Sequence, residues 1–174
     1  MNIQRSVVIW CRVLVLPVLL QVGISSAQDH RHSKRTHICA EPTPQAMCNA
    51  SNTCESPSAP CRIDVKRTDY GASATPALPG AKSNAPICVK AGTIVTWHSA
   101  SKNTGFTVDF GPSSPFDPAG AIIGGSDRSV SVTAKKEGCY KYSVGACDTD
   151  AIYGMCAEGT AELILIGAGT QAPQ

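Results

Sequence analysis

The sequence predicts an all-β fold, and three observations lead to that prediction. Short segments with alternating apolar and polar residues recur from Arg62 onward, which is typical of strands with one buried face. Gly, Pro, Ser and Asn separate these segments, as they do in turns between strands. Eight of the nine cysteines follow a predicted export signal, and an even number of them indicates disulfide bonds. We therefore predict a disulfide-stabilised Greek-key β-sandwich of about seven strands.

The expected strands are four to six residues long and favour Val, Ile, Thr, Tyr and Phe. No window with a 3.6-residue period and helix caps interrupts them. Trp97, Phe106, Val108 and Phe110 are bulky enough to fill the space between two sheets about 10 Å apart. The segments are 62–67, 87–90, 93–97, 106–110, 129–133, 139–144 and 161–166.

Residues 1–27 have the features of a secretory signal peptide. Arg5 and Arg12 supply positive charge, an apolar run follows, and the small residues Ser25 and Ala27 precede a cleavage site before Gln28. An uncleaved anchor is the alternative, but the run is shorter than the about 20 apolar residues that a span needs. We expect export to the periplasm or the extracellular space, without stable membrane insertion.

The mature chain has no surplus of charge. Removal of the signal leaves 13 basic and 13 acidic residues, so nucleic acid and anionic membrane surfaces are disfavoured as partners. The expected partner is an unidentified protein or small molecule.

Residues 28–37 predict a disordered polar arm. The arm contains His30, His32 and His37, which together are a weak candidate for binding a divalent metal. A solvated tail is the favoured interpretation. A second disordered tail is expected at 168–174.

Residues 38–61 form a Cys-rich segment ahead of the sandwich domain at 62–167. The segment has little apolar material, so cross-links have to stabilise it. Disulfides are favoured over a zinc site, because no Cys-x2-Cys pair is present. Asn49 begins a glycosylation pattern, which matters only in a suitable host.

The residues that catalysis requires are largely missing from the predicted sandwich. His98 is its one histidine and is interpreted as a surface or hydrogen-bonded residue, and the G-x-S-x-G pattern is absent. Asp148 and Asp150 are typical of a turn rather than of an acid and base pair. Gly124 and Gly125 do not precede a helix, so a phosphate-binding loop is not indicated. We do not expect an enzyme.

Residues 87–166 resemble the cupredoxin family. The resemblance rests on V-K-A-G-T-I-V-T-W at 89–97, F-T-V-D-F at 106–110, E-G-C-Y-K-Y at 137–142, G-M at 154–155 and the final A-E-L-I-L-I. It implies a β-sandwich in which the last two strands flank a loop that carries copper ligands.

The copper ligands that the resemblance implies are replaced in this sequence. A blue-copper site needs two imidazoles and a thiolate, usually with a distant Met. Phe106 occupies the position of the first imidazole and Val144 that of the thiolate, and the loop 145–158 contains no histidine. Only Met155 remains, as a weak candidate. We therefore predict no copper cofactor, with a divergent copper-binding or electron-transfer protein as the alternative.

Within the same loop, Cys147 and Cys156 could be combined with Met155 in a Cu(I) site, but a Cys147–Cys156 disulfide is favoured. Cys88–Cys139 is the simplest remaining pair in the sandwich. The cysteines left to pair among themselves are Cys39, Cys48, Cys54 and Cys61. The expected function is that of an exported, non-catalytic, cupredoxin-like binding or structural module.

Overall fold

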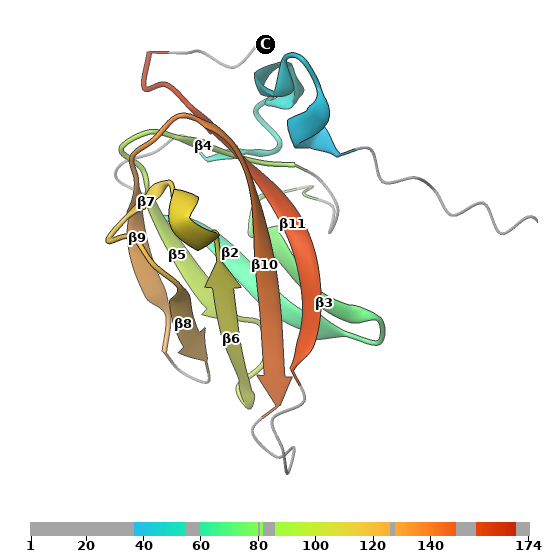
Figure 1. The fold of residues 1–174 in the computed structure, drawn as a ribbon. Coiled ribbons are helices and arrows are strands. Elements are labelled where there is room, and N and C mark those ends of the chain that lie inside the picture. The colour runs from blue at the N-terminus through green and yellow to red at the C-terminus, as the bar shows by residue number, and fades with distance from the viewer. Residues whose placement is uncertain are drawn as a thin grey trace, which may run out of the picture. The chain divides into compact units, whose positions relative to one another are not determined.

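Two β-sheets facing each other form the described part of the chain (Figure 1). The computed structural model describes residues 37–54, 60–79, 81, 86–125, 128–148 and 156–169, all within the unit Arg35–Gln174. The predicted signal peptide and most of the predicted arm lie outside these residues. In the described residues the only helices are the short 3-10 helices η1 (Ile38–Ala40), η2 (Pro44–Met47) and η3 (Gly111–Ser113).

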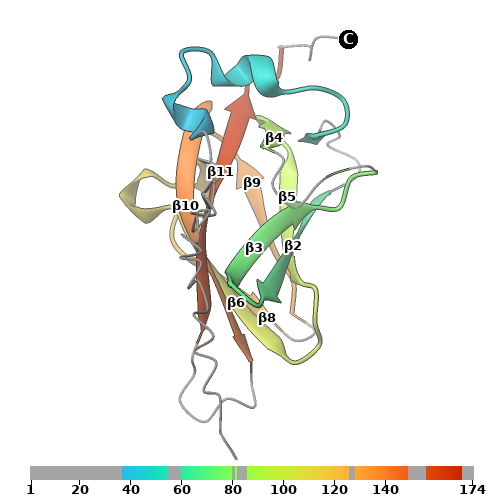
Figure 2. The ribbon, with the colours of Figure 1, turned by 90° about the vertical axis from the view of Figure 1, so that its right-hand side faces the viewer.

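The first sheet, here called sheet A, has six strands among the described residues. Their order is β1 (Thr53–Cys54), β4 (Ile87–Lys90), β11 (Ala157–Ile166), β10 (Gly138–Asp148), β6 (Thr104–Asp109) and β8 (Ile122–Gly125). The second, sheet B, has five. Their order is β3 (Gly71–Pro76), β2 (Cys61–Thr68), β5 (Ile94–Ser99), β9 (Val130–Ala134) and β7 (Phe116–Asp117). Figure 2 shows β10 and β11 on one side of the sandwich and β2, β3 and β5 on the other.

The all-β sandwich is confirmed, but the expected number of about seven strands is too small, because the described residues contain eleven. β1, β7 and β8 are very short or rich in glycine. β3 lies in a segment of Gly, Ala, Ser and Pro that the sequence predicts as a connection. Its small residues allow close contact with β11, since a Cβ atom on Gly159 would overlap the carbonyl oxygen of Ala72.

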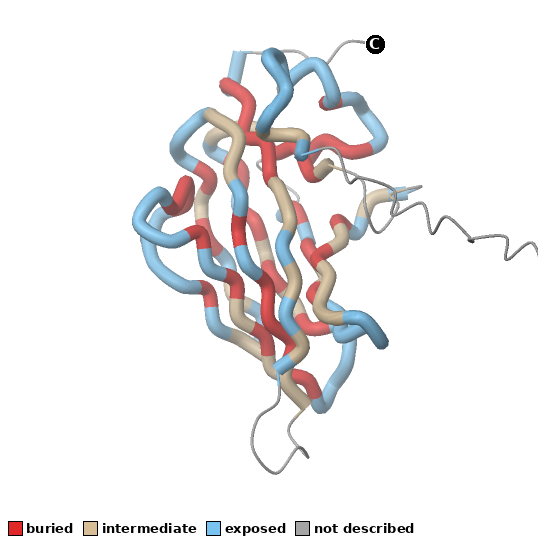
Figure 3. Tube along the Cα trace, turned by 45° about the vertical axis from the view of Figure 1, so that its right-hand side comes forward, coloured by how far each residue is buried: buried red, intermediate tan, exposed pale blue. Residues whose placement is uncertain are grey.

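Alternation of buried and exposed residues along the strands places one apolar surface of each sheet inside the sandwich (Figure 3). In β2, for example, Ile63 and Val65 are buried and Arg62 and Lys66 are exposed. Such alternation is what a strand with one solvated face requires.

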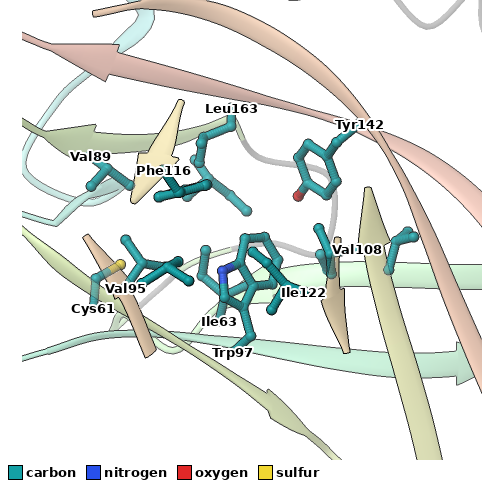
Figure 4. Close-up of a cluster of buried hydrophobic side chains, with 14 of the residues drawn as sticks. Cys61, Ile63, Val89, Val95, Trp97, Val108, Phe116, Ile122, Tyr142 and Leu163 are labelled. Carbon is teal, nitrogen blue, oxygen red and sulfur yellow. The ribbon is translucent and has the colours of Figure 1, made fainter. Parts of the chain in front are cut away.

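Trp97 lies fully buried in the core between the sheets (Figure 4). Its ring packs edge-on against Phe110, Phe116 and Tyr142, with centroid distances of 6.4, 6.4 and 5.7 Å. Edge-to-face packing is the arrangement that aromatic quadrupoles favour. The expected contribution of Trp97, Phe106, Val108 and Phe110 to the core is confirmed by their burial.

The Cys-rich segment is not separate from the sandwich, as the expected boundary at Arg62 implies. β1 pairs in parallel with β4 in sheet A. A second apolar cluster lies on the outer face of sheet A beneath η1 and η2. It consists of Cys48, Cys88, Ile164 and Ile166, with Ile38 and Cys139 packed against it.

All eight cysteines after the predicted signal form disulfides. The bonds are Cys39–Cys139, Cys48–Cys88, Cys54–Cys61 and Cys147–Cys156. The expected Cys147–Cys156 bond is present. The expected Cys88–Cys139 bond is wrong, and Cys39 and Cys48 therefore do not pair within their own segment.

The register of sheet A explains why Cys88 does not bond to Cys139. Both residues are paired with Ile164, from opposite sides, so the whole of β11 lies between them. Strands are about 4.8 Å apart, which places the two Cα atoms roughly 9–10 Å apart. A disulfide cannot bridge more than about 7 Å between Cα atoms. Each cysteine instead points outward and bonds to the segment above it.

Candidate functional site

The two positions that the resemblance assigns to copper ligands lie inside the apolar core. Phe106 on β6 is 2% exposed and Val144 on β10 is 1% exposed. The strands are neighbours, with Phe106 opposite Ala146 and Val144 opposite Val108. Neither side chain has a metal-ligating atom, so these positions contribute apolar packing.

Gly124 provides the space that the ring of Phe106 needs. A Cβ atom at position 124 would come within 2.6 Å of Cζ of Phe106, closer than real Cβ atoms approach. The glycine at this position is therefore explained by packing of the aromatic residue beneath it.

The Cys147–Cys156 disulfide joins the end of β10 to the residue that precedes β11. Both sulfur atoms are used in this bond, and a disulfide sulfur is a poor metal ligand. Met155 lies outside the described residues. The bond closes a loop at the end of the sandwich opposite to η1 and η2, as Figures 1 and 2 show.

Asp148 links three strands at the same end. Its Oδ1 accepts a hydrogen bond from Thr104 at 3.2 Å, and its Oδ2 lies 3.3 Å from Nη1 of Arg67. Asp150 lies outside the described residues. The contacts of Asp148 are those of a structural carboxylate at a strand end.

His98 on β5 belongs to a polar network on the outer face of sheet B. Arg62 donates to Nδ1 of His98 at 3.1 Å, because a guanidinium can only donate. The carboxylate of Asp64 lies 2.7 Å from Nε of Arg62 and 3.4 Å from the same imidazole nitrogen. The histidine is therefore hydrogen-bonded, as the sequence interpretation expects.

Two polar atoms in the aromatic core have no hydrogen-bonding partner among the described protein groups: Nε1 of Trp97 and Oη of Tyr142. Burial raises the pKa of Tyr142 far above its ordinary value, since an ionised phenol would be desolvated there. Tyr140, two residues earlier on the same strand, differs because its hydroxyl donates to Lys136 O or Glu137 O, each at 3.0 Å.

Glu162 on β11 is a functional candidate that the sequence prediction misses. Its side chain is only 11% exposed although it lies on the outer face of sheet A. It contacts His37, the one arm histidine among the described residues; His30 and His32 lie outside them. The signal that could have pointed to Glu162 is its position directly before an apolar run, L-I-L-I at 163–166, whose burial on both faces implies a cover.

Within the described ranges, no three His, Cys, Asp or Glu residues form a group that could hold a metal ion. The helices of the described part are too short to cross a bilayer. Asn49 is exposed, and its Oδ1 accepts hydrogen bonds from the backbone N–H and hydroxyl of Ser51 at 2.9 and 2.6 Å.

The chain matches no protein-family model and no curated protein. Among solved structures it is similar to amicyanin, in a reduced Cu(I) form at pH 4, with 14% identity over 62% of this chain and 82% of amicyanin and a TM-score of 0.34. An oxidised amicyanin mutant gives 14% identity, 64% and 87% coverage and a TM-score of 0.34, and a reduced mutant gives 14%, 65%, 94% and 0.35. TM-scores this low carry no argument about the chain. The fold is therefore described from its own sheets and disulfides.

Proposed function

We propose that the protein is an exported, non-catalytic module with a cupredoxin-like sandwich and no blue-copper site, and that it acts through binding or as a structural part. The burial of Phe106 and Val144 in the core is the observation that supports this proposal. Burying a side chain of this kind contributes about 1.5–3 kcal/mol to stability. The two positions thus serve folding where a copper protein would expose ligands to a metal.

Cross-links on both halves of sheet A support a structural role for the scaffold. Cys39–Cys139 and Cys48–Cys88 hold the segment that covers one end, and Cys147–Cys156 closes the other. Disulfides persist in oxidising compartments, which agrees with export. The predicted signal peptide at 1–27 supports the same localisation.

The engagement of the polar residues supports a non-catalytic assignment. His98 is held by Arg62 and Asp64, and Asp148 by Thr104 and Arg67. A general base has to reach a substrate proton with an available lone pair. In both groups the acceptor atoms already face protein donors on neighbouring strands.

Copper titration of the oxidised protein tests the proposal. A chain beginning at Ile38 removes the arm histidines and keeps every disulfide. We expect neither Cu(II) nor Cu(I) to bind at one equivalent with high affinity, and no intense visible absorption band to develop. The same chain after reduction is the positive control, since its free thiols should bind Cu(I). Tight binding of one copper ion by the oxidised chain would refute the proposal in favour of electron transfer or copper transport.

A further inference from the structure

The carboxylate of Glu162 is held in a fixed orientation on the outer face of sheet A. Its Oε2 accepts a hydrogen bond from the backbone N–H of Ile38 at 2.6 Å. Ile38 is adjacent to Cys39, whose disulfide to Cys139 joins this segment to β10. A backbone donor and a covalent link therefore determine where the carboxylate lies.

The other oxygen, Oε1, is buried and has no hydrogen-bonding partner among the described residues. Nδ1 of His37 lies 3.6 Å from it, and Nζ of Lys141 lies 3.9 Å from it. An unpartnered buried carboxylate oxygen is costly unless a cation or a donor compensates it. The imidazole of His37 is exposed, so it can move to admit a ligand between the two atoms.

We propose that His37 and Glu162 form half of a binding site for a divalent transition-metal ion such as Zn²⁺. Zinc lies about 2.0–2.2 Å from imidazole nitrogen and carboxylate oxygen, so two ligand atoms at a tetrahedral angle are about 3.4 Å apart. The observed 3.6 Å between Nδ1 and Oε1 is close to that separation. The hydrogen bond from Ile38 to Oε2 provides the outer-shell support that metal-binding carboxylates use.

The arm histidines supply the remaining ligands. Structural zinc sites need four ligands, and His32 and His37 have the spacing H-x4-H, which is within the range found in such sites. Five residues of extended chain span up to about 18 Å, so His32 and His30 can both reach an ion held at His37. The proposed site therefore joins the arm to β11, far from the positions of Phe106 and Val144 in the core.

Calorimetric titration with Zn²⁺ tests the site in the oxidised chain 28–174 at neutral pH. Zinc is the suitable probe because Cu²⁺ also binds peptides through backbone amides beside a histidine, which would report on the arm alone. We expect one equivalent of Zn²⁺ to bind to the unaltered chain. Glu162→Gln and His37→Gln should each weaken binding by about tenfold or more. Glu158→Gln, an exposed carboxylate on the same strand, should leave the affinity unchanged.

Lys141→Gln provides a test with the opposite sign. Its ammonium group competes for Oε1 and is 60% exposed, so its removal should raise the zinc affinity by about two- to fivefold without affecting folding. The proposal is overturned if the unaltered chain does not bind Zn²⁺, or if Glu162→Gln binds as tightly as it does. Thermal unfolding without metal confirms that each variant is folded, and His37→Gln gives a second answer if Glu162→Gln is not.

Discussion

Replacing Tyr142 by Phe should stabilise the protein, although most core substitutions destabilise. The hydroxyl of Tyr142 lies among Trp97 and Phe110, at ring-centroid distances of 5.7 and 4.7 Å, and no described protein group bonds to it. Burying a hydroxyl without a hydrogen bond costs about 1–3 kcal/mol in proteins. Loss of the oxygen's packing contacts offsets part of the gain. We therefore expect Tyr142→Phe to raise the free energy of unfolding by about 1 kcal/mol.

Tyr140→Phe is the matched control, because it removes the same atom from the same strand. There the hydroxyl donates to a backbone carbonyl at the turn before β10, so its loss should cost about 0.5–1.5 kcal/mol. Urea unfolding of the oxidised protein measures both changes, and thermal midpoints should move by about 2–4 °C per kcal/mol. The reasoning is refuted if Tyr142→Phe destabilises as much as Tyr140→Phe.

Three further predictions concern ionisation, packing and cross-links. Because the pKa of Tyr142 is raised in the folded state, its stabilising effect is complete below the ordinary tyrosine pKa of about 10, and stability should fall above it by up to about 1.4 kcal/mol per pH unit; urea unfolding of Tyr142→Phe should lack this contribution. Gly159→Ala should destabilise by about 1–3 kcal/mol or more, because its Cβ would overlap Ala72, whereas Gly105→Ala, with no contact under 3.7 Å, should cost far less; thermal unfolding that gave equal losses would contradict the close approach of β3 and β11. Removing the Cys39–Cys139 bond by a double Ala substitution should destabilise by about 4–5 kcal/mol on the chain-entropy relation, against about 2.5 for Cys54–Cys61, and equal losses in urea would count against that relation here.

The strands in the core could be predicted because their apolar residues alternate with polar ones, as in Ile63 and Val65 of β2. β3 could not, since Gly, Ala and Ser offer no contrast between its two faces. Disulfide partners depend on register: Cys88 and Cys139 are plausible partners in the sequence, and only the position of β11 between them excludes the bond. The contact between His37 and Glu162 was beyond sequence reasoning for a similar reason, because 125 positions separate the two residues.

The cover over sheet A connects the disulfides to the proposed metal site. Along β11 the residues pointing outward change from Glu162 to Ile164 and Ile166, and only the isoleucines lie in the apolar cluster beneath η1 and η2. Cys39 and Cys48 anchor the cover to the strands on either side of β11, so the apolar part is fixed covalently. Glu162 is the first polar residue beyond it and meets the chain where the predicted arm ends. Because the cover is already fixed, ion binding at Glu162 would order residues 28–36 without having to fold the segment that follows them. Hydrogen exchange with and without Zn²⁺ should therefore change in the arm and leave η1, η2 and β11 unaffected.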